Sequence, residues 1–312
     1  MKISIIGLGY VGLTTAICMG KLGHKVIGVD IDKEKVAKIK LKKSPLNVEK
    51  MDAYLKKYPF DVYLGHHRKA IMNSNITFIC VETPTKKSGS LNLMPLKRVC
   101  RTLGRAIKKK KYLGNKRYHI FVIRSTIFPG SFEILKKEIE ESSGKKCGKD
   151  FDIATNPEFL REKTAIDDFF NPSYIVVGAD KQEVGQKVMD CYSGIEAKKF
   201  IVDNNIAQMI KYANNSWHGC KVAFTNEMGR ICDNLNVNKD ELMKLFCEDT
   251  KLNISTYYMK PGKAFGGSCI PKDLAVLQKE GKKLKINIPI INSISKSNEI
   301  QKERDREDKI KL

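Results

Sequence analysis

The stretch MKISIIGLGYVGLTTAICMGKLGHKVIGVD, residues 1–30, predicts a strand, a helix and a second strand in succession. An apolar run over 2–6 is typical of a buried strand, and a helix-like stretch follows the glycines as far as Leu22. Gly23 breaks this helix, and a second strand covers 25–30. The N-terminal region therefore predicts a β-α-β unit.

Three glycines between the first strand and the helix have the spacing G-x-G-x-x-G. Gly7 permits a tight turn, Gly9 lets the backbone approach a pyrophosphate, and Gly12 lets the helix pack closely on the sheet. The N-terminus of the helix would face the phosphates. Asp30 would bind the ribose hydroxyls, which favours NAD over NADP. Glycines that only permit a turn are the alternative interpretation.

Strand and helix patterns alternate further along the chain. Strands are expected at 76–81, 119–124, 151–154 and 174–177, with helical stretches at 93–109 and 132–141 between them. The alternation predicts a Rossmann-type α/β fold, a doubly wound parallel sheet covered by helices. At Asn204 the pattern changes to one long amphipathic helix, apolar enough to serve a partner subunit. We therefore expect an NAD-binding domain over 1–203 and a helical dimerisation and catalytic domain over 204–312.

Composition narrows the classes of partner. The chain has 57 Lys and Arg against 35 Asp and Glu, and its formal net charge of +22 favours anionic partners. No nucleic acid is expected, because the basic runs lack a recognition motif and interleaved aromatics. Nine cysteines without C-x-x-C spacing and five histidines indicate neither disulfides nor a metal site, so we expect reduced thiols and a cytoplasmic location. No stretch approaches the roughly 18 apolar residues of a membrane span.

Ser125 and Thr126 follow the predicted strand 119–124. They would lie at the carboxyl end of that strand, where doubly wound folds bind ligands. A helix cap formed by either hydroxyl is the alternative interpretation.

The segment NPEFLRE, residues 156–162, predicts the start of a helix. Asn156 is expected to be the N-cap and Pro157 the first helical residue, which would place Glu158 and Glu162 on one face. These carboxylates could be a base and a substrate ligand, or acids that offset a helix dipole.

Two features of the last third of the chain indicate chemistry. One stripe of polar residues on the long helix indicates a cleft or a solvated face. It consists of Lys211, Asn215, His218 and Asn226.

Cys269 follows two glycines and precedes a helix expected to begin about Pro271. The helix N-terminus and Lys272 would favour its thiolate, so Cys269 is a candidate nucleophile, with a buried filler as the alternative.

The motifs GLGYVGL, STIFPG, NPEFLRE, KYANNSWH and FGGSCIPKD, in that order, resemble those of the nucleotide-sugar 6-dehydrogenases. Residues 248–260 are more similar to the GDP-mannose-oxidising members than to the UDP-glucose-oxidising ones, which are the alternative. The resemblance implies oxidation of a C6 alcohol to a carboxylate, from GDP-mannose to GDP-mannuronate, with two NAD. The steps in this family pass through an aldehyde, a cysteine thiohemiacetal and a thioester.

The resemblance also implies a role for each matching residue. Cys269 would be the nucleophile, and Lys211 would stabilise the oxyanion. Asp273, Glu158 and Thr126 would handle protons and the hydrolytic water. NAD would contact Gly7, Gly9, Tyr10, Val11, Gly12, Asp30, Lys35, Thr83, Thr126 and Lys272. The nucleotide sugar, partly across a homodimer interface, would contact Glu162, Lys211, Asn215, His218, Asn226, Tyr257, Tyr258 and Lys260.

Departures from the family pattern also have expected consequences. Glu82 stands where the family has glycine, so a negative charge near the pyrophosphate would weaken NAD binding. Residues 45–51 lack an E-P-G turn, and Lys260 replaces an arginine, which loses a bidentate phosphate contact. The chain also ends before the C-terminal domain of the family. A catalytically silent remnant that binds NAD and dimerises is therefore an alternative to an active enzyme.

Overall fold

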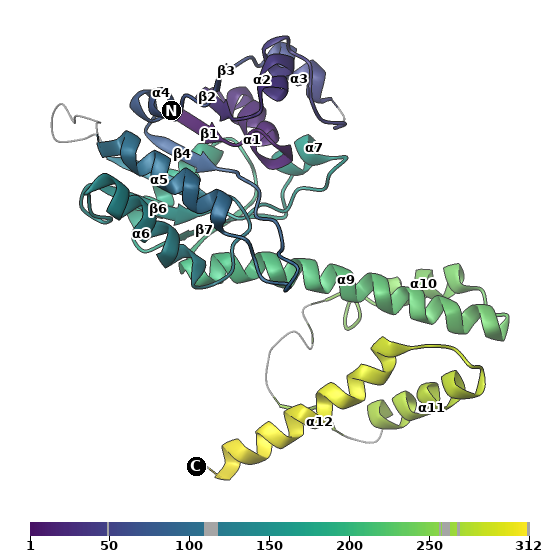
Figure 1. Cartoon of the computed structure of the whole chain (residues 1–312). Coiled ribbons are helices and arrows are strands. Elements are labelled where there is room, and N and C mark those ends of the chain that lie inside the picture. Colours follow the sequence, from purple (N-terminus) through teal and green to yellow (C-terminus); the bar gives the residue numbers. More distant parts are fainter. Residues whose placement is uncertain (49, 109–117, 256, 258–262, 267–268, 311–312) are drawn as a thin grey trace. The chain divides into compact units, whose positions relative to one another are not determined.

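The computed structural model describes residues 1–310 except 49, 109–117, 256, 258–262 and 267–268; the side chains of Cys269 and of 308–310 also lie outside the description. The chain divides into two compact units, Met1–Ala213 and Asn214–Leu312. Helix α9, Asn204–Leu235, begins in the first unit and ends in the second (Figure 1). The domain boundary at residue 203 stays a prediction.

The first unit contains an eight-stranded sheet with the order β3-β2-β1-β4-β5-β6-β7-β8. The strands are β1 (Lys2–Ile6), β2 (Lys25–Asp30), β3 (Asp61–Leu64), β4 (Ile76–Ile79), β5 (His119–Ile123), β6 (Phe151–Thr155), β7 (Tyr174–Ala179) and β8 (Lys198–Val202). The Rossmann-type fold is confirmed. One feature was not predicted: β7 pairs antiparallel with β6, so β7 and β8 run opposite to the other strands.

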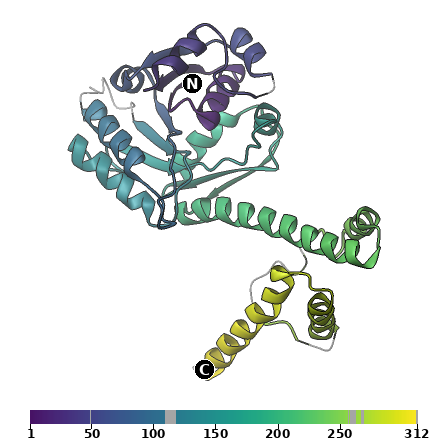
Figure 2. The same ribbon diagram turned by 45° about the vertical axis from the view of Figure 1, so that its right-hand side comes forward.

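Helices cover both faces of the sheet (Figures 1 and 2). They are α1 (Tyr10–Lys21), α2 (Lys33–Lys40), α3 (Met51–Lys57), α4 (His67–Asn73), α5 (Met94–Lys108), α6 (Ser131–Ser143), α7 (Ala165–Phe170), α8 (Gln182–Met189) and the 3₁₀ turn η1 (Asp190–Tyr192). Side chains of α4, α5 and α6 pack on one face, and those of α1, α7 and α8 pack on the other. This arrangement leaves the strand ends free to form a site.

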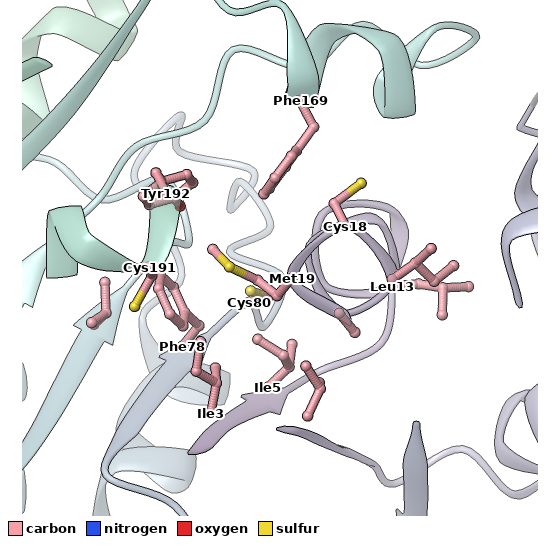
Figure 3. Close-up of a cluster of buried hydrophobic side chains, with 14 of the residues drawn as sticks. Ile3, Ile5, Leu13, Cys18, Met19, Phe78, Cys80, Phe169, Cys191 and Tyr192 are labelled. Atoms are coloured by element: carbon pink, nitrogen blue, oxygen red, sulfur yellow. The ribbon is translucent and has the colours of Figure 1, made fainter. Parts of the chain in front are cut away.

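Alternation along the strands divides the apolar residues between two cores. Ile3 and Ile5 of β1 belong to one core, and Ile6 belongs to the other. Figure 3 shows the first core, in which Phe78 of β4 lies among side chains of α1, α7 and η1. Every residue of β4 and of β5 is buried, because helices cover both faces of these strands.

Strand β1 lies at the point where the order of the sheet reverses. Its last residue, Ile6, pairs with Val29 of β2 on one side and with Ile79 of β4 on the other. Strands β2 and β3 lie on one side of β1, and β4 and the later strands lie on the other side. Ligands of doubly wound folds bind beyond the carboxyl ends of the strands at such a point.

The second unit contains the end of α9 together with α10 (Lys239–Glu248), α11 (Cys269–Lys283) and α12 (Pro289–Ile310). Its small core joins α9, α11 and α12 through Ile231, Leu274, Ile288 and Ile291. Helix α11 begins at Cys269 rather than near Pro271. Among the described helices, none has the length and apolar character needed to cross a membrane.

A buried carboxylate from α9 holds the start of α12. Glu227 is 2% exposed and accepts hydrogen bonds from the backbone N–H groups of Ile290 at 2.7 Å and Ile291 at 3.1 Å. These groups lie in the first turn of α12, where backbone donors lack partners within the helix. Glu227 therefore acts as an N-terminal cap supplied by another helix.

Substitution Glu227→Gln should destabilise the second unit, because an amide presents one acceptor where the carboxylate presents two. We expect a loss of about 1–3 kcal/mol, the cost of a buried donor without a partner. Amide hydrogen exchange of Ile290 and Ile291 should accelerate accordingly. Glu280→Gln, at a half-exposed carboxylate that pairs with Lys283, is the matched control. Equal exchange in both variants would contradict the capping role.

Candidate active site

The glycine loop brings the start of α1 against the end of β1. Gly7 has a φ of 89°, a left-handed conformation that favours glycine, and its N–H donates to Val29 O. A Cβ at Gly12 would lie 1.8 Å from the Gly7 carbonyl oxygen, whereas a Cβ at Gly9 would meet nothing within 4 Å. Only glycine therefore permits this packing at Gly12, while Gly9 faces open space.

Asp30 holds the loop and faces the same region. The side chain is 7% exposed and accepts from Leu8 N at 2.6 Å and from Asp32 N at 2.9 Å. The ammonium of Lys35 lies 3.5 Å from the same carboxylate. Asp30 and Lys35, both predicted to contact NAD, thus lie against each other at the carboxyl end of β2.

Two adjoining cavities open at the strand ends. The larger, about 550 Å³, has Gly7, Gly9, Asp30 and Lys35 in its lining. The smaller, about 170 Å³, is lined by Gly9, Tyr10, Val11, Cys80, Val81, Glu82, Thr83, Arg124, Ser125, Thr126 and Glu158. Gly9 and Glu82 belong to both linings, so the cavities meet at the glycine loop. An elongated ligand with one end in each cavity fits this arrangement.

The residues of the loop suit a dinucleotide. Helix α1 begins after Gly9 without a side-chain cap, so its first N–H groups are available to a phosphate. The buried hydroxyl of Tyr10 has no hydrogen-bond partner within the described residues, and burial raises the pKa of Tyr10 above its usual range. Tyr10 lines the smaller cavity, and a buried polar atom without a partner indicates a polar ligand there. The site therefore fits NAD.

Hydrogen bonds join the ends of β4 and β5. Ser125 Oγ donates to Val81 O at 2.6 Å, and Thr83 Oγ1 donates to Thr126 O at 2.9 Å. Helix α6 begins at Ser131, so neither Ser125 nor Thr126 is a helix cap and that alternative is wrong. These bonds hold Thr126 in the lining of the smaller cavity.

The segment that carries Glu158 differs from its prediction. No residue from 157 to 161 is helical, and the next helix, α7, begins at Ala165. The reason is that the Asn156 side chain is used elsewhere, donating to Val176 O at 2.7 Å and accepting from Arg124 and Tyr192. The dipole interpretation of Glu158 and Glu162 is therefore also wrong. Glu162 is exposed in the turn that follows.

A buried ion pair joins two of the predicted catalytic residues. Lys211 Nζ of α9 lies 2.9 Å from Glu158 Oε1, and the two side chains are 12% and 10% exposed. The ammonium also lies 5.7 Å from the centroid of the Phe159 ring. A pair this buried has a desolvation cost close to its Coulombic gain, so its presence is more informative about function than about stability.

The remaining predicted residues belong to the second unit. Asn215, His218, Asn226 and Tyr257 are exposed, and the ammonium of Lys272 lies 3.5 Å from the exposed carboxylate of Asp273. Tyr258, Lys260 and the side chain of Cys269 lie outside the described residues. Glu82 is exposed and lines both cavities of the first unit, where a negative charge was expected.

Burial makes several other thiols poor nucleophiles. It raises the pKa of Cys80 and of Cys191 to about 12, and that of Cys147 to about 11. Cys220 and Cys247 are exposed. Within the described residues, no group of three or more His, Cys, Asp or Glu is arranged to hold a metal ion.

The fold and the glycine loop define a protein of the dinucleotide-binding Rossmann class. Residues 1–196 match the NAD binding domain of the UDP-glucose/GDP-mannose dehydrogenase family, and residues 205–300 match its central domain. The chain belongs to this family of NAD-dependent nucleotide-sugar dehydrogenases. The resemblance read from the sequence motifs is thereby confirmed.

Individual relatives agree with this assignment. GDP-mannose 6-dehydrogenase of Pseudomonas aeruginosa is 42% identical over 97% of this chain and 70% of its own length, and that of Azotobacter vinelandii is 40% identical over 99% and 71%. A ternary complex of the Pseudomonas aeruginosa GDP-mannose dehydrogenase has a TM-score of 0.93 at 41% identity, covering 96% of this chain and 69% of that one. The UDP-glucose dehydrogenase of Pyrobaculum islandicum has a TM-score of 0.75 at 30% identity, covering 96% and 68%.

Alanine at the two glycines should separate packing from ligand binding. Gly12→Ala should lower the free energy of unfolding by about 3 kcal/mol, because its Cβ overlaps the Gly7 carbonyl. Gly9→Ala should leave the urea midpoint unchanged and weaken NAD binding, because its Cβ enters the open space. Urea unfolding and titration calorimetry measure the two effects. A stable Gly12→Ala protein would refute the packing argument.

Removal of the charge at Glu82 should strengthen NAD binding. Glu82→Gln takes a carboxylate away from the region where the cavities meet, so we expect a dissociation constant about fivefold lower at low salt. The difference should shrink as salt rises. Glu183→Gln, at an exposed position outside both linings, is the control. An affinity that does not respond to Glu82→Gln would show that the carboxylate does not act on the cofactor.

Proposed function

We propose that this chain oxidises the C6 alcohol of GDP-mannose to the carboxylate, giving GDP-mannuronate with reduction of two NAD. The identity of 40–42% to GDP-mannose 6-dehydrogenases supports this substrate over UDP-glucose, for which the relatives are 34–35% identical. The observation that carries the chemistry is the buried pair of Lys211 and Glu158 beside the smaller cavity.

The buried pair provides both a cation and a base. In a low-dielectric site, the ammonium of Lys211 would stabilise the negative charge that develops on a carbonyl oxygen. The Glu158 carboxylate orients that ammonium and would take a proton from water or from a hydroxyl. Thr126, held by Thr83, would position the same water. NAD, when bound, supplies the hydride acceptor.

The covalent steps belong to Cys269. Its thiolate would attack the aldehyde to form a thiohemiacetal, and oxidation of that adduct would give a thioester, which water hydrolyses to the carboxylate. Cys269 begins α11, and cysteines at helix N-termini have lowered pKa values. Asp273 and Lys272 follow in the first turns of the same helix, where Asp273 would carry protons and Lys272 would contact NAD.

Substrate recognition would use polar side chains. We assign the nucleotide sugar to Glu162, Lys211, Asn215, His218, Asn226, Tyr257, Tyr258 and Lys260. We also propose a homodimer, because α9 exposes apolar side chains that a second copy would cover: Ile206, Met209, Trp217, Val222 and Leu235. A cytoplasmic location would keep the free thiols reduced.

The proposal is tested by NADH formation with purified protein, NAD and GDP-mannose. We expect two NADH for each sugar oxidised, and a loss of about a thousandfold in kcat for Cys269→Ser, since the thioester can no longer form. Cys247→Ser, at an exposed thiol of α10, is the control and should keep its activity. Iodoacetamide labelling of Cys269, followed by peptide mapping, should be slowed by GDP-mannose.

Three results would contradict the proposal. NADH formed with UDP-glucose but not with GDP-mannose would change the substrate. Activity that survives Cys269→Ser would exclude the thioester route. NAD binding without NADH from either sugar would favour the silent, dimerising remnant.

A further inference from the structure

His67, the first residue of α4, lines the larger cavity together with Asp30 and Lys35. The residue is half-buried, and its ring nitrogen Nδ1 lies 2.9 Å from the carbonyl oxygen of Gly65. The backbone N–H of Gly65 in turn donates to the carbonyl oxygen of Asp30 at 2.9 Å. One turn at the ends of β2 and β3 therefore holds His67 in a fixed relation to Asp30.

The contact with Gly65 decides which nitrogen of the His67 ring carries the proton. A carbonyl oxygen can only accept a hydrogen bond, so Nδ1 must be the donor. Burial lowers the pKa of His67, although the bond to Gly65 and the nearby Asp30 carboxylate both act to raise it. The neutral ring then has its acceptor lone pair on Nε2, which no other group in the described part of the chain bonds.

The other acceptors that line the larger cavity have different surroundings. The carboxylates of Asp30 and Asp32 already accept backbone N–H groups of the turn after β2. The hydroxyl of Thr102 donates to a backbone carbonyl of its own helix, α5. Glu82 is exposed and lies where the two cavities meet. Nε2 of His67 is therefore a neutral acceptor that the described chain leaves for a ligand.

The larger cavity also suits a flat aromatic ring. Asp30 stands where this fold binds the ribose hydroxyls of a dinucleotide, so the adenine would occupy the same cavity beyond the ribose. Apolar side chains line it as well: Val29, Ile31, Pro95 and Val99. Ile31 is 81% exposed, and a ring bound in the cavity would cover it. Apolar walls and one imidazole acceptor together match the face and the polar edge of a purine.

We propose that His67 selects adenine in the dinucleotide, with Nε2 accepting a hydrogen bond from the exocyclic amino group of the base. The amino group of adenine is a donor, whereas the oxygen that replaces it in hypoxanthine is an acceptor. Two acceptors would then face each other, and the bond would be lost. A hydrogen bond kept with one base and lost with the other changes the affinity by about tenfold. This inference rests on NAD binding and does not depend on which sugar is oxidised.

Titration calorimetry of the full chain, without sugar, tests the proposal at neutral pH. The ligands are NAD and nicotinamide hypoxanthine dinucleotide, and the readout is the ratio of their dissociation constants. We expect the wild-type chain to bind NAD about tenfold more tightly than the hypoxanthine form.

Two variants should abolish this preference by different routes. His67→Phe keeps an aromatic ring without the acceptor, so NAD should bind more weakly and the ratio should approach one. His67→Gln can turn either its oxygen or its amino group toward the base, so the hypoxanthine form should bind about as tightly as NAD binds the wild type. His66→Phe is the matched control, because His66 is exposed, lies outside the cavity lining and packs near Tyr63. It should keep the wild-type ratio.

The outcomes separate this proposal from the proposed function. A wild-type chain that binds both dinucleotides equally overturns the role of His67, while NADH formation from the sugar would be unaffected. A wild-type preference that persists in His67→Gln overturns it too, even if circular dichroism shows that His67→Phe does not fold. Loss of the preference in His66→Phe would show that the turn acts through its structure. A chain that binds neither dinucleotide overturns this inference together with the NAD site of the proposed function.

Discussion

The contact between the start of α1 and the Gly7 carbonyl is the constraint on which the cofactor site depends. Because Gly12 has no Cβ, the helix can lie against the turn, and the first N–H groups of α1 then face the cavities. The bond from Leu8 N to Asp30 fixes the turn relative to β2. A single steric requirement thus sets the positions of the first N–H groups of α1 and of the Asp30 carboxylate together.

In the first unit, the partners of a cationic side chain differ with how far that side chain is exposed to solvent. Among the described lysines and arginines only Arg124 is buried, and its hydrogen-bond partners are neutral, whereas the largely buried Lys211 has one carboxylate. Exposed cations such as Lys50 and Arg161 pair with exposed or half-buried acids, which contribute little to stability. The Lys211–Glu158 pair contacts the cavity at the strand ends, where oxidation of a neutral alcohol would create and remove charge.

The sequence predicted those parts of the fold that depend on local pattern. The glycine spacing and the apolar strands of the sheet interior were sufficient to predict the Rossmann class. The order of the motifs was sufficient to predict the family. The edge strands β3 and β8 were missed, because they are short and partly exposed. The helix expected at Pro157 was wrong because Asn156 bonds to distant residues, and only tertiary structure reveals this. Arg124 was missed for the same reason: its burial has no local sequence signal.

The exposed strand β8 has a consequence for solubility. In the part of the chain that the structure describes, it pairs with β7 alone, so its outer edge presents backbone groups that could template a strand from another chain. Its apolar side chains include Phe200, which is 46% exposed. Lys198 and Lys199 begin the strand and are both exposed, and approach of a second copy in register would bring like charges together. Two lysines remote from the chemistry thus protect the protein against aggregation at an edge that the fold leaves open.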